Sequence, residues 1–284
     1  MKNVLSSVFA MLCLIACSGS ETQNTDSGKR IISLSPHITE ILFELGEQEN
    51  IIAVTDFCKY PEAALKIEKI GGLLNPDIEK IVTLNPTYIF GVPAHEKLNQ
   101  ELQKFNLKIN MIPNENLSDV FNTIKIIGKT LHRSPQALAL ISSIKDSLTK
   151  LRCESPGLQA MLIIGREGGT LRNITVAGKN TFIDEIWHLV GGVNIFNDLP
   201  SRYGTVNLEA IIERNSDVII EFDMQGDHAV IRQSISDEWD LLKNVAAIKN
   251  GHLFVIKGNH GLIPGPRVVL LAQDFKKIVH LVCN

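Results

Sequence analysis

Strand-like and helical apolar patterns alternate along most of this chain. A β-rich run is followed by Ser35-Pro36, a typical N-cap and first helical residue, and the helical apolar spacing then continues to Gly46. The same alternation repeats several times before residue 113, which predicts a parallel sheet covered by helices. The predicted strands are 30–34, 51–54, 87–90 and 108–112, and the other predicted helices begin at Asn75 and Glu96.

The alternation is interrupted in the middle of the chain. Ser118 is the predicted N-cap of a helix that runs to Leu131, and Ser134-Pro135 begins a second helix that ends near Leu151. No strand-like run separates them. The second helix spans roughly 25 Å, which is enough to bridge two lobes.

After this helix the strand–helix alternation resumes and ends in a closing helix over 266–282. We therefore predict an α/β chain with two similar lobes, each built on a central, mostly parallel sheet. The N-terminal lobe is expected over 30–131, a single long linking helix over 132–152 and the C-terminal lobe over 153–284. A ligand cleft is expected between the lobes.

Residues 75–90 and 205–220 carry one pattern twice. Aligned without gaps, Glu79 matches Glu209 and Asn85 matches Asn215, and apolar positions match between them. A spacing of about 130 residues is too wide for a solenoid repeat. It indicates two similar lobes, each presenting a glutamate from the first turn of an equivalent helix.

The first residues predict export. Lys2 precedes an apolar stretch over 4–15 that is too short for a permanent membrane span. Leu14-Ile15-Ala16-Cys17 resembles the lipobox of bacterial lipoproteins, in which cleavage precedes a lipid-bearing cysteine; an ordinary secretory peptide is the alternative. We expect a signal peptide over 1–16, a flexible polar tether over 17–29, and a periplasmic or cell-surface protein anchored through Cys17.

Net charge and cysteine content restrict the binding partners and the cross-links that this chain could have. The net charge is −3, and no basic stripe is present to bind nucleic acid. Cys58, Cys153 and Cys283 remain after the signal segment, without a CxxC spacing. One disulfide among them is possible in an oxidising compartment, and the sequence does not choose the pair.

Several segments together resemble the helical-backbone class of ABC-transporter substrate-binding proteins, whose members bind cobalamin, iron siderophores or haem. The resemblance covers nearly all of residues 30–280 and is nearest to the cobalamin-binding branch, through SPHITE, KYPEAALKIEKI and PRVVLLAQ. The segments are RIISLSPHITEILFELG, DFCKYPEAALKIEKIGG, DIEKIVTLNPTYIF, GGVNIF, VNLEAI and PGPRVVLLAQDF.

This resemblance implies a non-catalytic receptor without an enzymatic cofactor. It would capture a metal chelate, a corrinoid such as cobalamin or else a ferric chelate, and deliver it to a permease dimer with its ATPase subunits. Glu79 and Glu209 fall on the glutamates that meet permease arginines in this family. A first-turn carboxylate is also favoured by the helix dipole, so simple helix stabilisation is the alternative.

The resemblance also assigns residues to the ligand cleft. Phe57 and Tyr203 fall on aromatic positions of the cleft, and a flat aromatic face suits a macrocycle; a core position is the alternative for Phe57. Arg202 is a candidate partner for a ligand carboxylate or phosphate, with a solvated loop position as its alternative.

Other positions depart from the cobalamin branch. Leu73 stands where that branch has a large aromatic residue, and Asn259-His260 replaces an acidic–aromatic pair. His260 is a candidate ligand for cobalt or iron, or a hydrogen-bond donor, and His95 is a candidate for the cleft rim. These departures leave a ferric siderophore or haem open as cargo.

Two other functions are alternatives to a chelate receptor. A receptor for free Zn²⁺ or Mn²⁺ would need about three histidines and a carboxylate to converge, whereas the eight histidines are scattered. An enzyme would be expected to carry a motif such as HExxH, GxSxG or GxGxxG, and none is present. A chelatase-like activity rests on fold analogy alone.

Overall fold

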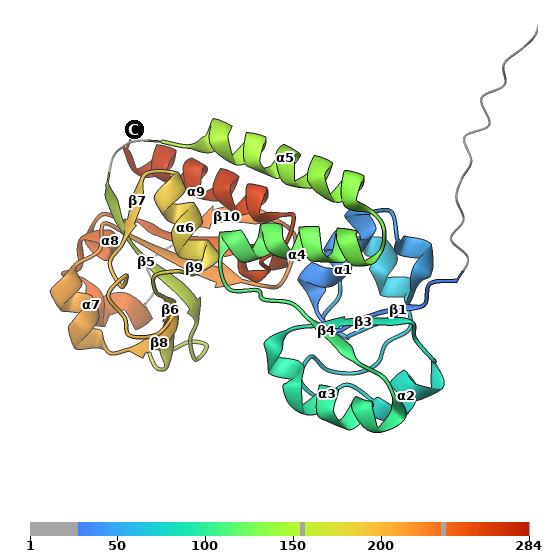
Figure 1. Ribbon diagram of the computed structural model, residues 1–284. Helices are drawn as coiled ribbons and strands as arrows, with labels where there is room; N and C mark the ends of the chain where they lie inside the picture. Colours follow the sequence, from blue (N-terminus) through green and yellow to red (C-terminus); the bar gives the residue numbers. More distant parts are fainter. Residues whose placement is uncertain (1–27, 154–156, 234–236, 284) are drawn as a thin grey trace, which may run out of the picture.

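A computed structural model describes residues 28–153, 157–233 and 237–283 of this protein. These residues form two α/β lobes that lie side by side, with long helices running across both of them (Figure 1). The predicted signal peptide over 1–16 and the predicted lipidation site Cys17 lie outside the described residues, as does nearly all of the predicted tether over 17–29. No helix in the described ranges is long and apolar enough to cross a membrane.

The N-terminal lobe contains a four-stranded parallel sheet in the order β2-β1-β3-β4. Its strands lie close to the predicted positions, and the first three along the chain are short, mostly buried apolar runs, as is typical of a parallel sheet covered on both faces. The strands are β1 (Ile31–Ser33), β2 (Ile51–Val54), β3 (Tyr88–Gly91) and β4 (Ile109–Met111), and the helices are α1 (Pro36–Glu44), α2 (Ile78–Thr83) and α3 (Glu96–Leu102).

The C-terminal lobe contains a seven-stranded sheet that is mixed, where the sequence predicted a mostly parallel one. Strands β5, β7, β9 and β11 run parallel, whereas β6, β8 and β10 run antiparallel to the strands beside them. The loop between β5 and β6 holds no helix, and a connection without a crossover favours antiparallel pairing.

The strands of this lobe are β5 (Leu158–Gly165), β6 (Ile174–Ala177), β7 (Gly192–Asn194), β8 (Tyr203–Val206), β9 (Val218–Asp223), β10 (Ala229–Arg232) and β11 (Leu253–Lys257). Its helices are α6 (Phe182–Leu189), α7 (Leu208–Arg214), α8 (Ala246–Lys249) and α9 (Val268–Cys283). A short 3₁₀ helix, η6 (Asn259–Leu262), follows β11.

Two long helices connect the lobes. Helix α5 (Ser134–Leu151) has the predicted bounds, and α4 (Leu117–Thr130) precedes it. The N-cap of α4 is Asn116, whose side chain accepts the N–H of Asp119 at 2.8 Å while the Asp119 carboxylate accepts the N–H of Asn116. This reciprocal capping box displaces the predicted cap, Ser118, into the first turn.

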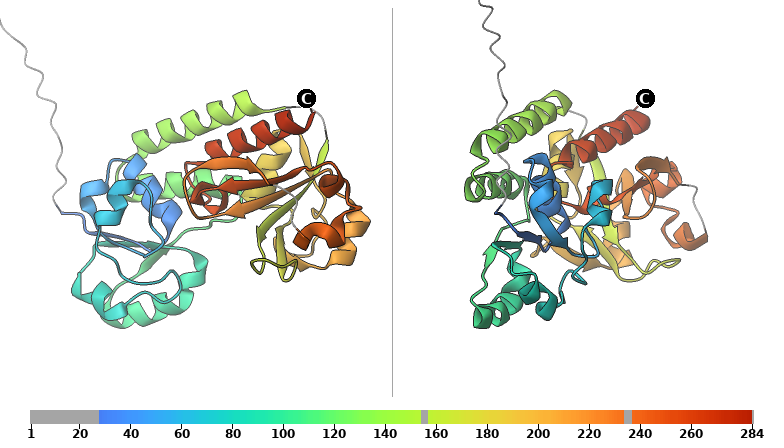
Figure 2. Two further views of the ribbon diagram at one scale, coloured as in Figure 1. Left: turned by 180° about the vertical axis from the view of Figure 1, so that it is seen from behind. Right: turned by 90° about the vertical axis from the view of Figure 1, so that its right-hand side faces the viewer.

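The chain crosses between the lobes more than once. It reaches the C-terminal lobe before α4, where the N–H of Leu117 donates to Glu185 Oε2 at 2.7 Å. Helix α4 then returns to the N-terminal lobe, where Arg133 pairs with the fully buried Glu47. Helix α5 crosses back beside α9 (Figures 1 and 2). The bridge is therefore an antiparallel helix pair, where the sequence predicted a single linking helix, because α4 also runs from one lobe to the other.

The apolar core is continuous across this bridge. One cluster of buried side chains includes Ile38 of α1, Ile124 of α4, Ile144 of α5 and Phe275 of α9, and it extends into β5 and β9. Side chains in such a core interdigitate closely and resist sliding past one another. The lobes are thus packed on a shared helical layer instead of being joined by a free hinge.

We expect only modest closure of the lobes when ligand binds, because wide rotation would separate side chains of this shared core. Small-angle X-ray scattering with and without ligand measures the change in radius of gyration. A large compaction on ligand addition would contradict the expectation.

Candidate functional site

A pocket of about 640 Å³ is lined by residues of both lobes, and we call it the interlobe pocket. Lys59 and Tyr60 contribute from the segment after β2. The C-terminal lobe contributes residues 224–228 after β9, residues 258–260 after β11, and Arg267 with Leu270 near the start of α9. The pocket therefore lies at the carboxyl ends of parallel strands, where open α/β sheets bind their ligands.

Arg267 connects the two lobes beside this pocket. Its guanidinium donates to the Glu40 carboxylate of α1 at 2.5 and 3.0 Å, and to Asn259 Oδ1 at 2.9 Å. It also lies 4.0 Å above the centre of the Tyr60 ring. Glu40 is only 2% exposed, and this burial raises the pKa of its carboxyl while the Arg267 bond lowers it.

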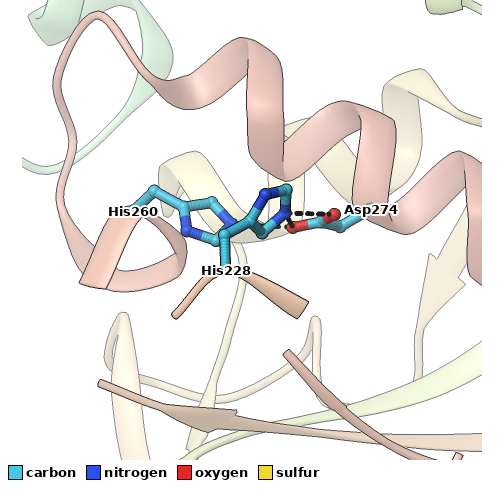
Figure 3. Close-up of side chains that lie close together, drawn as sticks. All are labelled: His228, His260 and Asp274. Atoms are coloured by element: carbon cyan, nitrogen blue, oxygen red, sulfur yellow. Dashed lines mark hydrogen bonds and ion pairs between the residues drawn. The ribbon is translucent and has the colours of Figure 1, made fainter. Parts of the chain in front are cut away.

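Three titratable side chains of the C-terminal lobe meet beside the pocket (Figure 3), and two of them, His228 and His260, line it. His228 Nε2 lies 2.8 Å from Asp274 Oδ1, and His260 Nε2 lies 2.7 Å from Asp274 Oδ2. His260 and Asp274 are buried, whereas His228 is exposed. Sequence reasoning selected His260 alone, because its two partners follow no motif spacing and come from different elements.

A second pocket of about 720 Å³ adjoins the first and shares Met224 and Gln225 with it. Arg166, which directly follows β5, lines this second pocket. Its guanidinium forms ion pairs with Glu221 at 2.5 Å and with Glu238 at 2.9 Å. Two carboxylates thus neutralise the positive charge of Arg166.

Tyr203 and Arg202 line a separate pocket of about 510 Å³, together with Glu115, Lys179 and Asn180. Tyr203 is 36% exposed, so part of its surface is open to a ligand. Burial, reinforced by the negative charge of Glu115, raises the pKa of the Tyr203 hydroxyl to about 12. The structure thus brings Tyr203 and Arg202 together without placing them in the lining of the interlobe pocket.

Asn259 and His260 both line the interlobe pocket, and Phe57, 51% exposed, is not a core residue. His95 is buried, whereas the sequence made it a candidate for the rim of the ligand cleft. It is 1% exposed, its Nδ1 accepts the Val92 N–H at 3.0 Å, and its Nε2 donates to the Leu73 carbonyl at 2.7 Å. Both ring nitrogens are therefore used to hold two loops together.

The two helices of the repeated segment are built alike. Asp77 caps α2 and Asn207 caps α7, each accepting the backbone N–H three residues further on, at 3.0 and 2.9 Å. Glu79 and Glu209 are the second residues of these helices, and both side chains are exposed. Each lobe therefore presents one accessible carboxylate from an equivalent position.

No disulfide joins the three cysteines of the described ranges, so the disulfide that the sequence left open is not formed there. Cys58 is buried beside the hydroxyls of Thr39 and Thr55, at 3.1 and 3.3 Å. Burial raises the pKa of the Cys58 thiol, which keeps it protonated.

His37 of α1 is buried near the junction of the lobes. Its Nδ1 lies 2.9 Å from the Ser35 hydroxyl, whereas its Nε2 has no hydrogen-bond partner among the described residues. Burial, followed by the charge of His95, lowers the pKa of His37 from 6.5 to about 3. The ring therefore stays neutral in the folded protein at pH values where an unfolded chain would protonate it.

This depressed pKa predicts acid sensitivity. The stability that depends on neutral His37 is complete above pH 6.5 and declines as the pH falls towards about 3, since the unfolded state then binds the extra proton. We expect about 2 kcal/mol of loss from this residue between pH 7.5 and pH 5. Urea unfolding of wild type and of His37→Gln at both pH values measures this loss of unfolding free energy. If the free energy of unfolding depends on pH equally in the two proteins, the prediction is contradicted.

Comparison with known proteins identifies a family and several relatives of this chain. The family model described as "Periplasmic binding protein" matches residues 31–259. A vitamin B12-binding protein of Vibrio vulnificus (strain YJ016) is 29% identical over 248 residues, which cover 87% of this chain and 88% of that protein. YvrC of Bacillus subtilis (strain 168), described as an uncharacterized ABC transporter substrate-binding lipoprotein, is 26% identical over 263 residues, covering 89% and 80%.

Solved structures share the fold. The periplasmic haem-binding protein HutB of Vibrio cholerae matches with a TM-score of 0.76 at 22% identity, covering 89% of this chain and 99% of that one. The periplasmic vitamin B12-binding protein BtuF of Vibrio cholerae matches with a TM-score of 0.73 at 21% identity, covering 90% and 98%. These likenesses confirm the predicted two-lobed α/β architecture.

Proposed function

This chain belongs to the periplasmic binding protein family, and from that premise we propose that it is the substrate-binding component of an ABC importer. Its cargo is a metal chelate, and a corrinoid such as cobalamin is the one we favour. The vitamin B12-binding relative from Vibrio vulnificus supports this choice, since the likeness extends over 87% of this chain. The protein acts as a receptor that releases its ligand unchanged.

The interlobe pocket carries this proposal, because residues of both lobes line it. Tyr60 is 44% exposed and presents an aromatic surface, which suits the flat ring of a macrocycle. Lys59 adds positive charge at the same pocket, which suits the phosphate of a cobalamin nucleotide loop. A ligand held there contacts both lobes at once.

Titration with three chelates tests the proposal. Purified protein is mixed with cyanocobalamin, haemin or a ferric siderophore, and binding is followed by calorimetry and visible absorption. We expect one corrinoid per chain, recovered chemically intact, with weaker binding of the other two. Preferred binding of haemin or of the siderophore would replace the corrinoid by that cargo. Chemical turnover, or binding of none of the three, would overturn the receptor function.

Tyr203, which lines the separate pocket, is proposed to stack on a part of the ligand that extends beyond the interlobe pocket. We expect Tyr203→Ala to weaken chelate binding by about 1–3 kcal/mol, by analogy with bases that stack on aromatic side chains. Calorimetry measures the change. Phe105→Ala is the matched control, since this exposed aromatic lies outside the lining of the pockets described above. Unchanged affinity in the Tyr203 variant would remove this residue from the binding site.

The partners of the proposed function are a permease dimer with its ATPase subunits. Glu79 and Glu209 are proposed to meet arginines of the permease, one from each lobe, because both carboxylates are exposed at equivalent helix starts. Export and a lipid on Cys17 would hold the protein near this permease. Mass spectrometry of the protein isolated from membranes would detect the lipid.

A further inference from the structure

We infer that His228, His260 and Asp274 bind a divalent transition-metal ion, with Zn²⁺ the ion that their donor atoms suit best. This ion is separate from any metal carried inside a chelate. The three residues come from the loop before β10, from η6 and from α9, and their side chains converge on one point (Figure 3).

The distances match a metal site. One ring nitrogen of each histidine and a carboxylate oxygen of Asp274 lie within 4.8 Å of one another. Both nitrogens already approach the carboxylate at 2.7–2.8 Å. Ligand atoms around tetrahedral zinc are separated by about 3.3 Å, given bonds of about 2.0–2.1 Å. Small side-chain rotations therefore suffice to place an ion among the three.

The two rings are also oriented for shared coordination. Their centroids are 4.5 Å apart and their planes meet at 78°, so they do not stack face to face. Both point Nε2 towards the same carboxylate. In the metal-bound form each neutral ring would carry its proton on Nδ1 and use the Nε2 lone pair as a ligand.

The charge of Asp274 favours a cation at this position. The residue is 4% exposed, and no lysine or arginine pairs with it within the described parts of the chain. A buried carboxylate needs a compensating positive charge or several hydrogen bonds. The two imidazoles supply hydrogen bonds to this carboxylate, and a divalent ion would supply a fixed positive charge as well.

The site is open on one side. The His228 side chain is 46% exposed, and both histidines line the interlobe pocket, which gives an ion a route of entry. Three protein ligands leave a fourth position of a tetrahedral ion for water or for a donor atom of a ligand. A bound ion would also tie the pocket-lining segment 224–228 to α9.

Metal titration of the chelate-free protein tests this inference. Tag-free protein stripped with a chelator is titrated with Zn²⁺ by calorimetry, and with Co²⁺ as a coloured substitute followed by visible absorption. We expect one Zn²⁺ per chain, and at least about tenfold weaker binding in His228→Gln and His260→Gln. His132→Asn is the control, because His132 is exposed and has a left-handed φ of 59° that asparagine also adopts.

His228→Gln is the decisive variant, since its exposed position makes misfolding a minor concern, and its thermal midpoint is recorded beside that of wild type. Equal Zn²⁺ affinity in this variant and in wild type would overturn the inference and direct attention to another group, such as the exposed Cys283 thiol. Absence of stoichiometric binding to wild type would overturn it too. Since no chelate is present, neither result bears on the proposed receptor function.

Discussion

Reversing the charge of both Glu79 and Glu209 should abolish ligand uptake while leaving ligand affinity nearly unchanged. Both carboxylates are exposed at the second position of short, similarly capped helices, one in each lobe. A lysine at each position would face permease arginines, and like charges in contact across an interface cost several kilocalories per mole. Two such contacts would reduce uptake by more than about a hundredfold.

Transport into cells or vesicles that contain the cognate permease measures uptake, and calorimetry measures affinity. The matched control reverses Glu96 and Glu213, which are exposed on α3 and α7 and change the net charge equally. Normal uptake by the Glu79/Glu209 double variant would remove the docking role. A large loss of ligand affinity would instead indicate that these residues act on the binding pocket.

Replacing Arg267 by methionine should lower the free energy of unfolding by about 3–5 kcal/mol. The Glu40 carboxylate is 2% exposed and receives two hydrogen bonds from Arg267. Without the guanidinium this buried charge has lost its ion-pair partner, and the contact between α1 and the start of α9 is lost with it. Because burial already raises the pKa of Glu40, the variant should protonate this carboxyl more readily.

Urea unfolding at pH 7.5 measures this loss, and the double variant Glu40→Gln with Arg267→Met shows its origin. Removing both charges should restore most of the lost stability, because the cost comes from the unpaired carboxylate. Glu44→Gln, an exposed glutamate of the same helix, is expected to change stability by less than about 0.5 kcal/mol. An Arg267→Met protein as stable as wild type would show that the ion pair contributes little.

Local features of the fold followed closely from the sequence. Helix α5 has the bounds predicted from its Ser134-Pro135 start and its apolar stripe. Asn85 and Asn215, which match in the repeated segment, both adopt left-handed backbone conformations, with φ of 45° and 46°. Asparagine tolerates this conformation better than most residues, so a single residue type marks the turn in both copies.

Other features depended on competition between neighbours or on distant partners. Ser118 is a good cap by type, but Asn116 and Asp119 satisfy each other and begin α4 earlier. Strands β6 and β8 pair antiparallel in the second sheet, and the direction of pairing is not encoded in a short apolar run. His95 appeared as a loop histidine in sequence, whereas packing buries it between two backbone groups.

The sequence by itself determined the two-lobed α/β plan, the paired helices that present Glu79 and Glu209, and membership of a binding-protein family. Tertiary structure alone decided how Arg267 meets Glu40 across 227 residues, and how His228, His260 and Asp274 meet beside one pocket. The difference has a physical origin. Helix caps and apolar periods act over a few residues, whereas these side chains are brought together by the packing of elements whose spacing leaves no periodic signal.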